Sequence, residues 1–176
     1  ATREKYGLPS RFVLYLGGFD PRKNVSRLIR AYSRLAAAGE APPDLVIAGR
    51  LPDRPTAFFT DPREDIQRTG RGEQVHCVGE VAEDDKPALY SLATCFVFPS
   101  LYEGFGLPVL EAMACGAPVV TSRSSSLGEL AGDAGLLVDP HSEEEIAGAM
   151  ARLVGEPATR AEYAGRSLER SRQFQW

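Results

Sequence analysis

Two glutamates, Glu103 and Glu111, stand on either side of a glycine-containing turn in the segment LYEGFGLPVLEAMACGAP, residues 101–118. An apolar run at residues 95–98 predicts a short strand before this segment, and residues 107–115 have the pattern of a helix. The turn therefore joins the carboxyl end of a strand to the start of a helix, where open α/β sheets bind their ligands. Backbone N–H groups at a helix start attract phosphates, whereas a carboxylate accepts hydrogens from the hydroxyls of a ribose or a sugar. This combination predicts a site for a sugar nucleotide.

The segment resembles the E-x7-E motif of retaining glycosyltransferases of the two-domain GT-B type, in the group 1 family (GT4) that includes bacterial mannosyltransferases. The resemblance implies that Glu103 meets the transferred sugar as a catalytic residue and that Glu111 binds the ribose. It also implies that the donor is held by the backbone of the run between them: Gly104, Phe105, Gly106 and Leu107. From the residues alone, a turn whose glutamates face solvent remains an alternative.

A second candidate loop, GGFDPRKN at residues 17–24, follows another predicted strand and precedes a helix. The family that the chain resembles has a lysine at the place of Lys23 and an arginine five positions earlier, both contacting the diphosphate. The resemblance therefore makes Lys23 a catalytic and donor-binding residue. Gly17 and Gly18 are donor-binding candidates because backbone at the end of a strand can approach a bound ligand closely. Gly18 stands where the arginine is expected, and Arg22 is a candidate replacement. A solvated basic turn is the alternative for Lys23 taken alone.

The stretch VGEV at residues 78–81 resembles the family segment that borders the nucleotide base, so Val78 is expected at the donor. The base itself stays open. GDP-mannose is the first candidate donor, because GGFDPRKN resembles versions found in mannosyltransferases, and a UDP-sugar is the other. No cofactor and no metal ligands are expected, since the resemblance implies that cationic side chains and helix starts act at the diphosphate.

The fold that must position these residues is an α/β fold with a doubly wound parallel sheet of the Rossmann type. Apolar runs predict six strands, at residues 11–16, 45–48, 74–78, 95–98, 118–121 and 136–138. Helical patterns alternate with them at residues 24–38, 62–69, 84–93, 107–115, 125–131, 143–153 and 158–172. Such alternation predicts a parallel sheet with helices on both faces. The resemblance implies that this sheet is one half of a GT-B fold. Ser142, followed by Glu145, predicts a capping box at the start of one helix.

The overall composition excludes several other classes of protein. A chain of 176 residues can form one packed domain, and 43% hydrophobic with 25% charged residues is typical of globular proteins. The net charge of -4 gives no support for a nucleic-acid partner. No apolar run reaches the length of a transmembrane segment, and the N-terminus lacks the apolar core of a signal peptide. We therefore expect a cytoplasmic protein, able to bind at a membrane surface through a further domain.

The two ends of the chain resemble domain boundaries of the same family. The segment REKYGLP, near the start, resembles the linker that enters the C-terminal domain, and the closing FQW resembles the tryptophan after which the chain crosses back. We expect a linker from a missing N-terminal domain at residues 1–10 and the C-terminal nucleotide-sugar-binding domain at residues 11–176. An unidentified acceptor, either a glycan or a lipid-linked molecule, is expected on the missing domain. The isolated chain is therefore expected to be inactive in transfer.

The leading hypothesis is a retaining hexosyltransferase of polysaccharide biosynthesis, with this chain as the donor-binding half and mannose as the first candidate sugar. A non-catalytic nucleotide-sugar-binding module is the alternative. A glycosidase that uses Glu103 and Glu111 as acid and nucleophile or base fits less well, because a helix start that attracts phosphate lies between them. A sugar-nucleotide epimerase of the same architecture also fits less well, because the E-x7-E segment resembles the transferases more closely.

Overall fold

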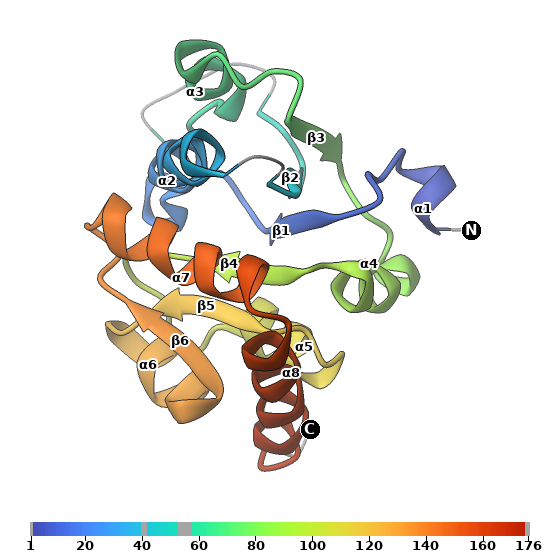
Figure 1. Ribbon diagram of the computed structural model, residues 1–176, viewed down its shortest axis with the longest axis vertical. Helices are drawn as coiled ribbons and strands as arrows, with labels where there is room; N and C mark the ends of the chain where they lie inside the picture. Colours follow the sequence, from blue (N-terminus) through green and yellow to red (C-terminus); the bar gives the residue numbers. More distant parts are fainter. Residues whose placement is uncertain (1, 40–41, 53–57, 175–176) are drawn as a thin grey trace.

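One parallel sheet forms the centre of the molecule in the computed structural model, which describes residues 2–39, 42–52 and 58–174. Its strand order is β3-β2-β1-β4-β5-β6 (Figure 1). The strands are β1 (Phe12–Leu16), β2 (Asp44–Ala48), β3 (Val75–Gly79), β4 (Cys95–Phe98), β5 (Val119–Ser122) and β6 (Gly135–Val138). All six predicted strands and the doubly wound α/β fold are confirmed, with small differences at the strand ends.

The helices also follow the predicted alternation. They are α1 (Thr2–Lys5), α2 (Val25–Ala38), α3 (Pro62–Thr69), α4 (Lys86–Leu92), α5 (Leu107–Ala114), α6 (Ser125–Ala131), α7 (Glu143–Gly155) and α8 (Pro157–Ser171). Helices α2 and α7 pack against each other, and α8 packs against both α7 and α5 (Figure 1). The helix α1 falls within the predicted linker, and Trp176 lies outside the described residues. No helix in the described ranges is long and apolar enough to cross a membrane.

Burial explains why the strands could be identified as continuous apolar runs. The strands β1, β4 and β5 are buried along their whole length. A parallel sheet with helices on both faces requires this, because neither face of a central strand meets water. Helix α2 shows the other pattern: it buries Val25, Leu28, Ile29, Tyr32 and Leu35 at helical spacing against the sheet.

The predicted capping box is only half formed. The Ser142 hydroxyl accepts the Glu145 N–H at 3.1 Å, as an N-cap does. The Glu145 carboxylate does not return to Ser142. It accepts the Asp139 N–H at 2.9 Å and pairs with Arg123, which follows β5. This carboxylate therefore ties the start of α7 to the end of β5.

The strand order reverses between β1 and β4. Strands β2 and β3 lie on one side of this point, and β5 and β6 lie on the other. In doubly wound sheets the crossovers leave such a switch point toward opposite faces, and the crevice between them binds ligands. Both candidate loops emerge here: residues 17–24 follow β1, and the loop that contains Glu103 lies between β4 and α5.

Candidate functional site

The two predicted catalytic residues form one ion pair at the switch point. Lys23 Nζ lies 2.6 Å from Glu103 Oε1, and the side chains are 19% and 13% exposed. They are 80 residues apart in the chain. The ammonium group also lies 5.3 Å from the centre of the Phe98 ring, within the range of a cation–π contact. The sheet topology therefore joins the lysine of one loop to the glutamate of the other.

Asn24, the residue after Lys23, fastens three loops together. Its side chain is buried, and Nδ2 donates to the carbonyls of Pro99 at 2.9 Å and Pro140 at 2.7 Å. Its Oδ1 accepts from Arg27 at 2.8 Å. The backbone of Asn24 has φ of 62°, a left-handed conformation that asparagine tolerates better than most residues. Sequence reasoning missed this role, since its partners lie after β4 and β6.

The turn before α5 offers free backbone donors. Gly106 has φ of 101°, and a Cβ there would lie 2.5 Å from Leu127 Cδ2, so the position requires glycine. Pro108, in the first turn, has no N–H to satisfy. The N–H groups of residues 104–107 donate to no atom of the described chain. They remain available to an anionic or hydroxyl-rich ligand, as predicted for a helix start.

The start of α6 fixes the backbone of Glu103. The Glu103 N–H donates to Ser125 Oγ at 3.3 Å, and the Ser126 hydroxyl donates to the Glu103 carbonyl at 2.9 Å. Ser125 itself has φ of 58°, an unfavourable conformation for a serine. Strained backbone of this kind is concentrated at functional sites. The α6 start thus holds the loop in which Glu103 lies.

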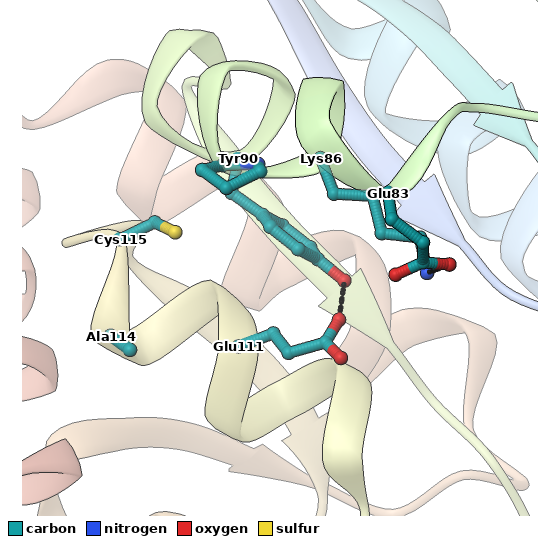
Figure 2. A pocket seen from close by; sticks show the side chains of 7 residues that line it. Glu83, Lys86, Tyr90, Glu111, Ala114 and Cys115 are labelled. Atoms are coloured by element: carbon teal, nitrogen blue, oxygen red, sulfur yellow. Dashed lines mark hydrogen bonds and ion pairs between the residues drawn. The ribbon is translucent and has the colours of Figure 1, made fainter.

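Glu111 lies in a separate cavity of about 300 Å³ between α4 and α5 (Figure 2). The Tyr90 hydroxyl points toward this carboxylate and donates to Glu111 Oε2 at 3.0 Å. Burial, followed by the charge of Glu111, raises the pKa of Tyr90 far above its usual value, so the phenol stays a donor. Glu83, in the 3-10 turn before α4, and Lys86, the first residue of α4, line the same cavity.

A second hollow of about 410 Å³ adjoins the first, because Glu83 and Lys86 line both. Gly17 and Gly18 border it after β1, and Gly49 borders it after β2. A Cβ at Gly49 would lie 2.0 Å from the Gly17 carbonyl oxygen, so the two loops approach closely only because this residue is glycine. The second hollow lies at the carboxyl edge of the sheet, and the two neighbouring hollows are together called the groove below.

Two of the residues considered in the sequence are not among those that line the groove. Val78 lies within β3 and packs against the core, and the groove is lined instead by Glu80 and Val81. Arg22 pairs with Asp20 at 2.9 Å, is 66% exposed and does not line the groove.

Arg50 is a residue that sequence reasoning missed. It follows Gly49 at the carboxyl end of β2 and lines the groove together with Gly17 and Gly18. It is exposed and has no hydrogen bond or ion pair to the described part of the chain. The signal was its place directly after a strand of a doubly wound sheet, where ligand-binding residues gather.

The site contains cationic side chains, and the described residues offer no candidate metal centre beside them. Within residues 2–39, 42–52 and 58–174, no group of three or more His, Cys, Asp or Glu side chains could hold a metal ion. Lys23 and Arg50 bring positive charge to the switch point and the groove. Such groups can bind a diphosphate directly.

Comparison with known proteins gives consistent results. The family model described as "Glycosyl transferases group 1" matches residues 1–170. The O-antigen chain mannosyltransferase B of Escherichia coli is 36% identical over 174 residues, covering 98% of this chain and 45% of the relative. A sucrose-phosphate synthase from Thermosynechococcus elongatus superposes with a TM-score of 0.83 at 30% identity, covering 98% of this chain and 43% of that chain. Anabaena HepE, solved in complex with UDP-glucose, superposes with a TM-score of 0.80 at 24% identity, covering 97% and 46%. The chain thus spans less than half the length of each of these proteins.

Proposed function

Since this chain belongs to the group 1 glycosyl transferase family, we propose that it is the donor-binding half of a retaining hexosyltransferase that uses a nucleotide-diphosphate sugar. The observation that carries the proposal is the ion pair of Lys23 and Glu103 at the switch point. Its charges lie where doubly wound folds bind nucleotides. The free N–H groups before α5 and the cavity of Glu111 adjoin the same loops.

The diphosphate binds at Lys23 and at the N–H groups of residues 104–107. A lysine ammonium has three hydrogens, and one of them is used by Glu103. The other two can reach phosphate oxygens without breaking the ion pair. During transfer the leaving diphosphate gains negative charge, and a fixed ammonium with fixed N–H dipoles stabilises that charge. Glu103 faces the donor sugar.

The nucleoside occupies the groove between α4 and α5. Tyr90 donates to Glu111 Oε2, so Oε1 of this glutamate is left to accept the hydrogens of a ribose diol. The adjoining hollow, bordered by Gly17, Glu80 and Val81, has room for the base. Glu83 and Lys86 line both hollows, so a ribose in one hollow and a base in the other can belong to one nucleoside, which supports the proposal.

Mannose is the proposed sugar and GDP-mannose the proposed donor. Support comes from the mannosyltransferase of Escherichia coli at 36% identity. A UDP-sugar remains the second candidate, although the relationship to HepE, at 24% identity, supports the fold alone. We propose that the acceptor, a glycan or a lipid-linked molecule, binds to a further N-terminal domain joined through residues 1–10. In this proposal residues 11–176 form the donor domain of a cytoplasmic enzyme.

A glycosidase is less well supported than a transferase. Its two carboxylates must flank one glycosidic bond. Here Glu111 shares its cavity with Tyr90, whereas Glu103 is outside that lining and is bound to Lys23. The two glutamates are thus suited to different parts of one long ligand.

Calorimetry on the purified chain tests the proposal. GDP-mannose, GDP, UDP-glucose and UDP are titrated, each with and without EDTA. We expect GDP-mannose and GDP to bind, with EDTA leaving the affinity unchanged. Binding of none of the four ligands would refute the donor site, and loss of binding in EDTA would refute the metal-free diphosphate contact. Binding without any transfer by a protein that includes the further domain would favour the non-catalytic module.

A further inference from the structure

Ser100 is a buried hydroxyl directly behind the candidate site. It follows β4 and Pro99, and its side chain is completely buried. Its Oγ lies 2.7 Å from Glu103 Oε1, 2.9 Å from the Arg22 carbonyl and 3.3 Å from the Tyr102 carbonyl. All three neighbours are acceptors, and a serine hydroxyl has one hydrogen to give.

The Ser100 hydroxyl donates its hydrogen to Glu103. A carboxylate is a stronger acceptor than a peptide carbonyl, and its oxygen is also the nearest of the three. The Arg22 carbonyl has another donor, because the Leu101 N–H reaches it at 2.7 Å. The Arg22 carbonyl therefore keeps a donor when the Ser100 hydroxyl donates to the carboxylate.

Ser100 is itself held in place from the neighbouring strand. The hydroxyl of Ser122, the last residue of β5, donates to the Ser100 carbonyl at 2.6 Å. Both serines are completely buried. The backbone of Ser100 is therefore held by the last residue of β5.

The two oxygens of Glu103 have different surroundings. Oε1 receives both Lys23 Nζ at 2.6 Å and the Ser100 hydroxyl at 2.7 Å. Oε2 has no hydrogen-bond partner in the described part of the chain. A carboxylate whose one oxygen is held by two donors from different loops has a fixed rotamer, and its second oxygen has a fixed direction.

We propose that Ser100 is a positioning residue that, together with Lys23, commits Glu103 Oε1 to the protein and presents Oε2 to the donor sugar. The proposal rests on the proposed function for the identity of the ligand, a nucleotide-diphosphate hexose. Oε2 then accepts a hydrogen from a sugar hydroxyl, while Lys23 keeps its remaining hydrogens for the diphosphate. Ser100 touches no part of the donor and acts only through Glu103.

The first test compares two affinities in three proteins: the wild-type chain, Ser100→Ala and Thr121→Val. Thr121 is the matched control, because its buried hydroxyl donates to the Phe98 carbonyl at 2.8 Å and does not contact Glu103. Calorimetry gives the dissociation constants for GDP and for GDP-mannose, or for the UDP pair if the wild type prefers it. We expect Ser100→Ala to shift the ratio of the two constants about tenfold against the sugar conjugate, since a misdirected group loses most of its contribution. The constant for the diphosphate alone should change by less than about twofold, a negligible free energy.

A merely structural role gives a different result. If Ser100→Ala weakens both ligands equally, or if Thr121→Val shifts the ratio as much, the positioning role is overturned. An unchanged ratio in Ser100→Ala overturns it as well. Both variants are also compared with the wild type by thermal unfolding, so that loss of folded protein is not mistaken for loss of affinity.

The second test needs no ligand. Crystal structures of the wild type and of Ser100→Ala should differ at Glu103, whose carboxylate is expected to leave its single orientation in the variant. The same orientation in both crystals refutes positioning by Ser100. If the wild-type chain binds no nucleotide, the proposed function fails, and the crystal structures still decide whether Ser100 directs Glu103.

Discussion

Replacing Glu103 by glutamine should strengthen the binding of a free nucleoside diphosphate. In the empty site Lys23 is paired with Glu103 at 2.6 Å. A phosphate oxygen that binds another hydrogen of the same ammonium comes to within about 4–5 Å of the carboxylate, given ordinary hydrogen-bond lengths. The diphosphate is therefore attracted by Lys23 and repelled by Glu103. Glutamine keeps the size and an acceptor oxygen, but it removes the repelling charge.

The magnitude follows from Coulomb's law. Two unit charges about 4 Å apart repel by about 1 kcal/mol in water and by about 4 kcal/mol at an effective dielectric constant of 20. The side chains are partly exposed, and the groove is open, so we expect about 1–2 kcal/mol, which is about 5- to 30-fold tighter binding. The sugar conjugate should gain less, because glutamine weakens the contact with the sugar hydroxyl by about 1 kcal/mol or more.

Calorimetry at low and high salt measures both effects. Glu162→Gln on α8 is the control, because it makes the same change in net charge at an exposed ion pair with Arg166. The gain for the diphosphate in Glu103→Gln should shrink in high salt, since screening weakens the repulsion in the wild type. Weaker diphosphate binding in Glu103→Gln, or an equal gain in Glu162→Gln, would show that Glu103 does not oppose the diphosphate at Lys23.

Three further predictions concern the ribose contact, the groove cation and the loop fastening. Glu111→Gln should weaken the diphosphate and its sugar conjugate alike by about 10- to 100-fold, the value of a charged hydrogen bond, whereas Tyr90→Phe should cost about tenfold or less; unchanged calorimetric affinity in Glu111→Gln would contradict the ribose contact. Arg50→Ala should weaken diphosphate binding about tenfold by removing a charged contact, and Arg22→Ala should have little effect; the reverse order in the same titrations would return the phosphate contact to Arg22. Asn24→Ala should lower the free energy of unfolding by about 2–4 kcal/mol, from lost hydrogen bonds and a strained left-handed alanine; urea denaturation with an unchanged midpoint would show that the three loops do not depend on this side chain.

The elements of the fold could be predicted because each has a local cause. Strand β1 is a run of five apolar residues, all buried, and α2 repeats its apolar residues at helical spacing. The position of Glu111 in a helix and of Glu103 before it follows from the same local patterns. These predictions needed no knowledge of which strands are neighbours.

The contacts of the site could not be predicted because they join loops that are distant in the chain. Lys23 and Glu103 were assigned separately to phosphate and sugar, and their ion pair depends on β1 lying beside β4. Nothing in the sequence distinguishes Ser100 from the other serines, because its contact with Glu103 depends on the fold. Val78 lies within β3, and the lining of the groove begins at Glu80, beyond the end of that strand.

The side chain of Asn24 has a consequence for how the site opens. Asn24 lies in the loop after β1, and its side chain is hydrogen-bonded to the loop after β4 and to the loop after β6. Movement of any one of these three loops therefore breaks a hydrogen bond to another. Segments coupled in this way open as one cooperative unit, with one opening free energy. A ligand held by any one of these loops then slows amide hydrogen exchange in all three, including the loop before α7, which borders neither hollow of the groove.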